Sequence, residues 1–239
     1  MRIAIIGYGK MGHEIEKAAI EKQHSIPKII NIENLRDLNF LRNDEVDVAI
    51  EFTQPDSAIQ NIKSCANQKI PIVVGTTGWY DRFEEVKNYV LEQNGTLFYA
   101  SNFSIGVNLF FALNKYLAKI MDKQDSYSVS MEEIHHTQKL DSPSGTAITL
   151  AEGIIEHSST KEKWANEETG KKEMIDIVSK RIENVPGTHS ISYHSPIDQI
   201  DIKHTAFNRK GFAQGSVASA EWVQNKKGVY TMSDMLNFL

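Results

Sequence analysis

Short apolar runs and amphipathic segments alternate along the N-terminal part of the chain. Each apolar run is typical of a strand buried on both faces, and the segments between the runs have helical spacing. The predicted strands are Ile3–Ile6, Lys28–Ile32, Val46–Phe52, Ile70–Val74 and Thr96–Ala100. The predicted helices are Glu14–Ala19, Ser57–Ala66 and Asp81–Glu92. Because strand and helix alternate, the sequence predicts an α/β fold with a Rossmann-like, doubly wound parallel sheet.

The pattern changes from Gly106 onward, where strands outnumber helices. Apolar residues predict helices over Gly106–Met121, Thr146–His157 and Gly215–Asn225. The predicted strands are Tyr127–Ile134, Lys172–Ser179, His189–Tyr193 and Gln199–Phe207. Such a run of strands indicates an α+β domain whose mixed or antiparallel sheet is covered by helix on one face. The polar segment Ser158–Lys172 is expected to be a mobile surface segment.

The turn after the first predicted strand carries the pattern G-x-G-x-x-G over Gly7–Gly12. Between a strand and a helix, these glycines allow a tight turn, approach of a pyrophosphate to the backbone, and close helix packing. Glu33 follows the second predicted strand, where an acidic residue is expected to bind the adenosine ribose of NAD. The next residue, Asn34, favours NADH over NADPH, but Lys28 and Arg36 leave NADPH open.

Small, hydroxyl and amide residues follow three further predicted strands. Ligands of doubly wound sheets bind beyond the carboxyl ends of the strands, so these residues are candidates for contact with the same cofactor. The predicted cofactor-binding residues are Gly7, Tyr8, Gly9, Lys10, Met11, Gly12, Glu33, Thr53, Gly75, Thr76, Thr77, Ala100, Ser101, Asn102 and Phe103.

Two modest lobes are expected for a chain of 239 residues. We predict a dinucleotide-binding domain made of residues 1–105 and 214–239, because the C-terminal tail is expected to fold back on the first lobe. Residues 106–213 would then form a substrate-binding and oligomerisation domain. An exposed sheet face with apolar alternation needs covering, so self-association through this domain is expected.

Composition narrows the class of protein. With 41% hydrophobic and 24% charged residues the chain has an ordinary globular composition, and its net charge of −5 argues against a general nucleic-acid binder. The single cysteine, Cys65, cannot form an internal disulfide and is expected to be a packing residue. The first apolar run is too short for a signal peptide or a membrane span, so a cytoplasmic location is expected.

The densest group of polar residues lies in Glu132–Ala147, between a predicted strand and a predicted helix. It contains the adjacent pair His135 and His136, then Lys139, and then a Ser-Gly-Thr turn at Ser144. A helix N-terminus and a lysine attract anions, and histidines exchange protons near neutral pH. The segment therefore predicts a pocket for an acidic small molecule that must receive a proton.

Structural explanations exist for each of these residues taken alone. Ser144 could be a helix N-cap, Lys139 could be a solvated side chain, and the histidines could be polar residues at a strand end. A metal site is not expected, because no further histidine, cysteine or acid shows metal-site spacing to the pair. It is the combined spacing that favours a catalytic interpretation.

The segment Glu133–Ala147 resembles the E-x-H-H-x-x-K-x-D-x-P-S-G-T-A motif of the 4-hydroxy-tetrahydrodipicolinate reductase family, long called dihydrodipicolinate reductases. Segments on the cofactor side resemble family motifs in the same order, and the resemblance covers nearly the whole chain. They are Gly7–Gly12, Glu33, Glu51–Pro55, Gly75–Gly78 and Ser101–Asn108. The stretch from Arg181 to His189 resembles R-x-G-x-x-x-G-x-H, although Glu183 stands where a glycine is usual.

This resemblance implies reduction of the cyclic product of the lysine-pathway aldolase, in the diaminopimelate route, by NADH or NADPH with loss of water. It also implies a homotetramer joined through the strand-rich domain. We expect Lys139 to donate the proton, and the resemblance makes His135 a proton donor or acceptor. Neighbours in a regular strand point to opposite faces, so either the strand breaks or only one histidine reaches the ligand. The predicted substrate-binding residues are His136, Ser144, Gly145, Thr146 and Arg209.

Two other functions remain open at this point. A different two-lobe dehydrogenase, acting on sugars or on substrates like aspartate semialdehyde, would be expected to lack the adjacent histidines and the Pro-Ser-Gly-Thr turn. A regulator that senses NADH without turnover would need neither Lys139 nor His135 as a proton donor.

Overall fold

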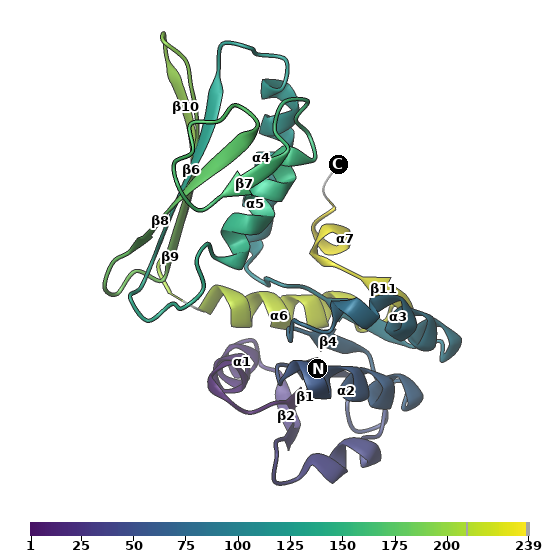
Figure 1. Cartoon of the computed structure of the whole chain (residues 1–239). Helices are drawn as coiled ribbons and strands as arrows, with labels where there is room; N and C mark the ends of the chain where they lie inside the picture. Colours follow the sequence, from purple (N-terminus) through teal and green to yellow (C-terminus); the bar gives the residue numbers. More distant parts are fainter. Residues whose placement is uncertain (209, 238–239) are drawn as a thin grey trace. The chain divides into compact units, whose positions relative to one another are not determined.

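The computed structural model describes residues 1–208 and 210–237. The chain forms two compact units, which are drawn together in Figure 1. The first unit consists of Met1–Ile105 and the segment that begins at Lys210, and the second unit begins at Gly106. No helix in the described part of the chain is long and apolar enough to span a membrane.

The first unit is built on a six-stranded sheet with the order β11-β5-β4-β3-β1-β2. Its strands are β1 (Arg2–Ile6), β2 (Ser25–Ile30), β3 (Val48–Glu51), β4 (Ile72–Val74), β5 (Thr96–Tyr99) and β11 (Gly228–Tyr230). All neighbouring strands are parallel, which confirms the predicted doubly wound sheet. The strand β11 was not among the predicted strands, and it extends the sheet beside β5.

Helices cover both faces of this sheet. They are α1 (Lys10–Glu21), α2 (Pro55–Asn67), α3 (Phe83–Glu92), α6 (Lys210–Val223) and α7 (Met232–Leu236), with the 3-10 turns η1 (Leu35–Phe40) and η2 (Tyr80–Arg82). Successive residues of β1 point to opposite faces, so Ile3 and Ile5 join one apolar core with α1 and α6. Ala4 and Ile6 join the other core with α2, α3 and η1.

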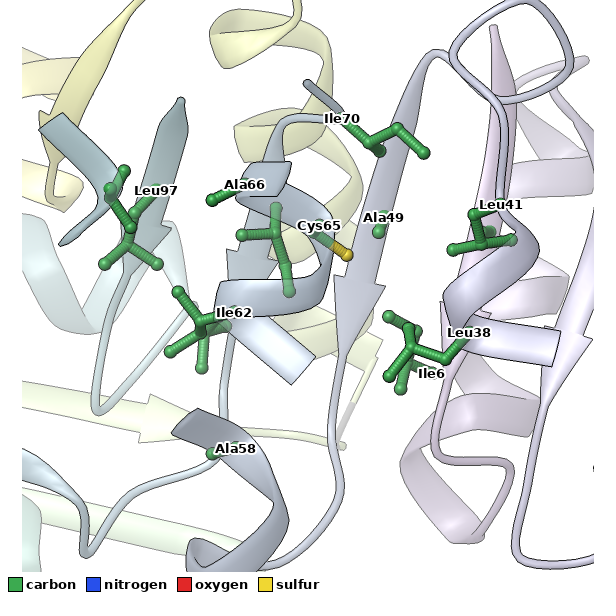
Figure 2. Packing of buried hydrophobic residues seen from close by; sticks show 14 of the residues in the cluster. Ile6, Leu38, Leu41, Ala49, Ala58, Ile62, Cys65, Ala66, Ile70 and Leu97 are labelled. Atoms are coloured by element: carbon green, nitrogen blue, oxygen red, sulfur yellow. The ribbon is translucent and has the colours of Figure 1, made fainter. Parts of the chain in front are cut away.

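Figure 2 shows part of the core that α2, α3 and η1 form with the sheet of the first unit, and side chains of α2 face the sheet there. Cys65 is fully buried there beside Ile62 and Ala49, and burial raises the pKa of its thiol to about 12. The cysteine is therefore an inert packing residue, as expected from the sequence.

The second unit contains a five-stranded mixed sheet with the order β10-β9-β6-β8-β7. Its strands are β6 (Ser128–His135), β7 (Lys163–Ala165), β8 (Met174–Arg181), β9 (Gly187–His194) and β10 (Gln199–Ala206). The pairs β6–β8 and β7–β8 are parallel, and the pairs β6–β9 and β9–β10 are antiparallel. Helices α4 (Ile105–Met121) and α5 (Gly145–Ile155) pack on one face of the sheet, as predicted (Figure 1).

Two expectations for this unit are wrong. Part of the segment Ser158–Lys172 forms the strand β7, and Trp164 packs against the apolar core, so the segment is not wholly a surface loop. The sheet face away from the helices is mainly polar rather than apolar, because residues such as Ser130, Ser192 and Asp201 are neighbours across β6, β9 and β10. This sheet face therefore gives no apolar surface that self-association would need to cover.

Candidate functional site

The glycine turn between β1 and α1 has the geometry of an anion-binding loop. Gly7 has φ +93°, and a Cβ on it would lie 2.1 Å from the carbonyl oxygen of Phe52. A Cβ on Gly12 would lie 2.4 Å from the carbonyl oxygen of Gly7, so only glycine lets the helix start this close to the strand. A Cβ on Gly9 would meet nothing within 4 Å, which leaves the outer side of the turn open. That open backbone at the start of α1 fits a pyrophosphate.

The ends of β3 and β4 are joined by a polar network. The backbone N–H of Thr53 donates to Oγ1 of Thr76 at 2.8 Å, and the hydroxyl of Thr53 donates to the carboxyl of Glu51. Asn61 of α2 also donates to Glu51, at 3.2 Å. Glu51 is fully buried, and this burial raises its pKa although the hydrogen bonds of its neighbours act in the opposite direction. Two predicted cofactor-binding loops are therefore joined by the hydrogen bond from Thr53 to Thr76, and the buried carboxyl group of Glu51 holds Thr53 in place.

Several other predicted cofactor residues have structural tasks of their own. The side chain of Phe103 is buried in the core, and its carbonyl oxygen faces Gly215 of α6. Tyr8 donates its hydroxyl hydrogen to Glu16. Asn102 accepts a hydrogen bond from the backbone of Ser104. These side chains stabilise the loops, so a ligand would meet mainly backbone groups and the exposed residues between them.

The remaining predicted cofactor residues are distributed over the same loops. Lys10, Ser101 and Thr77 are exposed, whereas Met11, Ala100 and Gly75 are partly buried. Glu33 is exposed in the turn after β2, as its predicted ribose contact requires. Asn34 donates to the carbonyl oxygen of Ile29 at 2.9 Å and so closes this turn.

In the second unit, the predicted catalytic segment begins at the end of β6. His135 is the last residue of this strand and is buried, whereas His136 follows the strand and is partly buried. Lys139 lies in the next loop, with its Nζ 2.8 Å from both carboxylate oxygens of Asp141. This lysine lowers the pKa of Asp141 through its hydrogen bond.

The start of α5 is capped as the sequence suggests. Ser144 is the N-cap, and its Oγ accepts a hydrogen bond from the backbone of Ala147 at 3.2 Å. Gly145 is exposed, Thr146 is partly buried, and the first turn contains no acidic residue. An anion at the first turn would therefore meet N–H groups and no acidic side chain of that turn, while the N–H of the N-cap Ser144 is already taken by the carboxylate of Glu133. Arg209 lies outside the described residues.

A fully buried carboxylate, Glu133, connects these parts of the second unit. Strand register places it opposite His189 of β9 and Ser179 of β8. The backbone N–H of Ser144 donates to both of its oxygens at 3.0 and 3.1 Å, and Ser179 donates at 2.9 Å. Arg181 approaches the same carboxylate at 3.4 Å. Glu133 thus links the start of α5 to the edges of β8 and β9.

The charges of this cluster are set by burial and hydrogen bonds. Burial alone would raise the pKa of Glu133, but hydrogen bonds from His135, Ser144 and Ser179 outweigh it and hold that pKa well below its usual range. Burial, together with the neighbouring His135, lowers the pKa of His189 to about 4. At neutral pH, Glu133 is therefore ionised and His189 is uncharged.

Glu133, His135 and His189 also have the spacing of a metal site, since one ligand atom from each lies within 4.8 Å of the others. Sequence spacing missed this group because Glu133 and His189 are on different strands. Arg181 already faces the carboxylate, and Ser144 and Ser179 donate hydrogen bonds to it. These contacts satisfy the carboxylate without a metal ion.

Comparison with known proteins gives a consistent result over the full chain. Family profiles described as the N-terminus and the C-terminus of dihydrodipicolinate reductase match residues 1–103 and 106–236. The 4-hydroxy-tetrahydrodipicolinate reductase of Christiangramia forsetii is 47% identical, over 100% of this chain and 99% of its own. The protein of the same name from Buchnera aphidicola is 34% identical, over 99% of this chain and 98% of its own.

A solved structure agrees on the fold. The dipicolinate-bound dihydrodipicolinate reductase of Paenisporosarcina superposes with a TM-score of 0.79 at 24% identity, covering 100% of this chain and 99% of the other.

Proposed function

The chain belongs to the dihydrodipicolinate reductase family, and we propose that its Glu133–Thr146 segment binds and protonates the substrate of that family's reaction. It is an oxidoreductase that reduces 4-hydroxy-tetrahydrodipicolinate to tetrahydrodipicolinate with NAD(P)H and loss of water, in the diaminopimelate route to lysine. The observation that carries the residue assignment is the grouping of His135, Lys139 and the start of α5 at one end of the second sheet.

The first unit holds the nicotinamide cofactor. Gly9 leaves the backbone open to the pyrophosphate, and the loops of Thr53 and Thr76 are held together by their hydrogen bond. Bound NAD(P)H supplies the hydride of the reaction. The exposed position of Glu33 supports a contact with the ribose hydroxyls, and hence a preference for NADH, because a 2′-phosphate would meet its negative charge.

The second unit holds the substrate and supplies the proton. The substrate is a ring with two carboxylates, and the start of α5 at Ser144–Thr146 receives one of them. Lys139 donates a proton to the ring as the hydride arrives, because the added electron density must be quenched. His136 and Arg209 contribute further substrate contacts, and His135 exchanges a proton at the site.

Assembly and location are extensions of the same proposal. The strand β10 pairs only with β9 among the described strands, so its outer edge presents unpaired backbone groups. Ile197 and Phe207, just beyond the two ends of β10, are about nine-tenths exposed. This edge supports a homotetramer joined through the second unit. The proposed location is the cytoplasm.

The experiment that tests the function follows the absorbance of NADH with the purified protein. The account expects oxidation of NADH when the aldolase product is present, and none with aspartate semialdehyde or without substrate. Oxidation with aspartate semialdehyde instead would identify a different dehydrogenase. Binding of NADH without oxidation in any mixture would identify a sensor.

A further inference from the structure

Glu133 is a buried titratable group that the reaction described above does not use. It is two residues before His135 on β6, so the period of a strand places both side chains on the same face. Oε2 of Glu133 lies 3.3 Å from Nδ1 of His135. This buried nitrogen makes no hydrogen bond of regular geometry within the described residues, so its contact with Glu133 is a close approach at ion-pair distance.

We propose that Glu133 is a positioning residue that keeps the proton of His135 on Nδ1 and thereby leaves Nε2 as the atom that exchanges a proton. The inference rests on the proposed role of His135. A carboxylate only accepts hydrogen bonds, so the ring nitrogen that faces Glu133 must carry a hydrogen. The opposite nitrogen of a neutral ring is then the unprotonated one, and it can act as a base.

The surroundings of the ring hold it in this orientation. Nε2 faces Gly187 of β9, where a Cβ would lie only 3.1 Å away, so the glycine makes room for the imidazole. The ring of His189 packs edge-on against His135 with centroids 5.0 Å apart. His189 is itself held by Ser144, whose Oγ lies 3.1 Å from its Nε2.

Glu133 can do this because the other contacts fix its own position. Ser144 at the start of α5, and Ser179 and Arg181 on β8, hold the carboxylate from two different elements. Its orientation is therefore determined before any ligand binds, which is what a positioning residue requires. The same contacts couple the start of α5 to the orientation of His135.

The test compares E133Q with E132Q as a matched control. Glu132 is the neighbouring acid on the same strand, but it is partly exposed and pairs with Lys180. In E133Q the amide can donate a hydrogen bond to Nδ1, which would move the ring proton to Nε2. We expect kcat to fall by roughly 10²–10⁴-fold in E133Q, with little change in the KM for NADH, and to be unchanged in E132Q.

A second measurement reads the tautomer directly. Nitrogen-15 NMR at a pH where the rings are neutral, with His135 identified by comparison with H135Q, is expected to show the Nδ1–H form in the wild type and the Nε2–H form in E133Q. An Nε2–H form in the wild type overturns the proposal, and this result does not depend on whether E133Q folds. An unchanged tautomer in E133Q also overturns it. A changed tautomer with unchanged kcat would support the positioning claim and overturn the proton role of His135 instead.

Discussion

Nζ of Lys139 lies 2.8 Å from both carboxylate oxygens of Asp141, two residues further along the loop. The carboxylate of Asp141 is mostly exposed, so the ion pair is screened by water and contributes little to stability. The pair therefore orients the ammonium group rather than holding the loop together. Removing Lys139 should consequently act on catalysis and not on folding.

For Lys139→Ala we expect kcat to fall by roughly 10²–10⁴-fold, because the ring loses its proton donor. The dissociation constant for NADH, measured by fluorescence, should stay the same, and the melting temperature should change little. The matched control is Lys123→Ala, an exposed lysine in the turn after α4. A variant that keeps the kcat of the wild type would remove Lys139 from the proton step.

The glycine turn has two roles, close packing of helix on strand at Gly12 and approach of the pyrophosphate at Gly9, and one substitution tests each role. Gly12→Ala places a Cβ 2.4 Å from the carbonyl oxygen of Gly7, so the free energy of unfolding should fall by roughly 1–3 kcal/mol or more. Gly9 has φ −88° and an open outer side, so Gly9→Ala should fold normally. Its methyl group would stand where the pyrophosphate approaches, so the KM for NADH should rise. Thermal unfolding and steady-state kinetics measure both effects, and normal cofactor binding by Gly9→Ala would argue against this loop as the pyrophosphate site.

Glu51 should make the stability of the protein depend on pH. Burial raises its pKa in the folded state above that of the unfolded chain, so the native state binds the proton more tightly. The contribution of protonated Glu51 to the stability of the folded state is complete below the pKa of the unfolded chain. It is lost as the pH rises through the pKa of the folded state. Glu51→Gln should therefore gain stability relative to the wild type as the pH rises above about 4.5, in denaturant unfolding. A difference between the two proteins that stays constant with pH would contradict a buried, raised pKa.

Glu33→Ala tests the predicted contact with the ribose. Losing the hydrogen bond between the ribose and the charged Glu33 should raise the KM for NADH by roughly tenfold. The KM for NADPH should rise less, because the substitution also removes the repulsion between Glu33 and the 2′-phosphate. Glu45→Ala, another exposed acid in the first unit, serves as the control. If the ratio of the two KM values does not change, Glu33 makes no ribose contact.

The sequence predicted the two sheets because their signals are local. Apolar runs such as Ile3–Ile6 indicate buried parallel strands, and the glycine turn marks the point where β1 gives way to α1. The short strand β7 was missed since its polar surroundings resemble a loop, and it forms through pairing with β8. Pairing between distant segments has no local signal.

The same reason explains why the contacts around Glu133 were not predicted, although the resemblance had singled out the stretch from Arg181 to His189. Ser144 and Lys139 were identified from their spacing, whereas His189 and Arg181 meet Glu133 only through strand register. The predicted strand Tyr127–Ile134 ended one residue before His135, whereas the observed β6 includes it, so Glu133 and His135 are two apart in one strand and share a face. Burial of Glu133 could not be read from that spacing.

The central claim is that this protein transfers a hydride from a nicotinamide cofactor to the aldolase product. The most direct measurement supplies NADH that carries two deuterium atoms at C4, together with the aldolase product, and analyses the tetrahydrodipicolinate by mass spectrometry. The account predicts that each product molecule carries one deuterium and that one NADH is consumed for each. Product without deuterium, or no product while NADH remains intact, would contradict it.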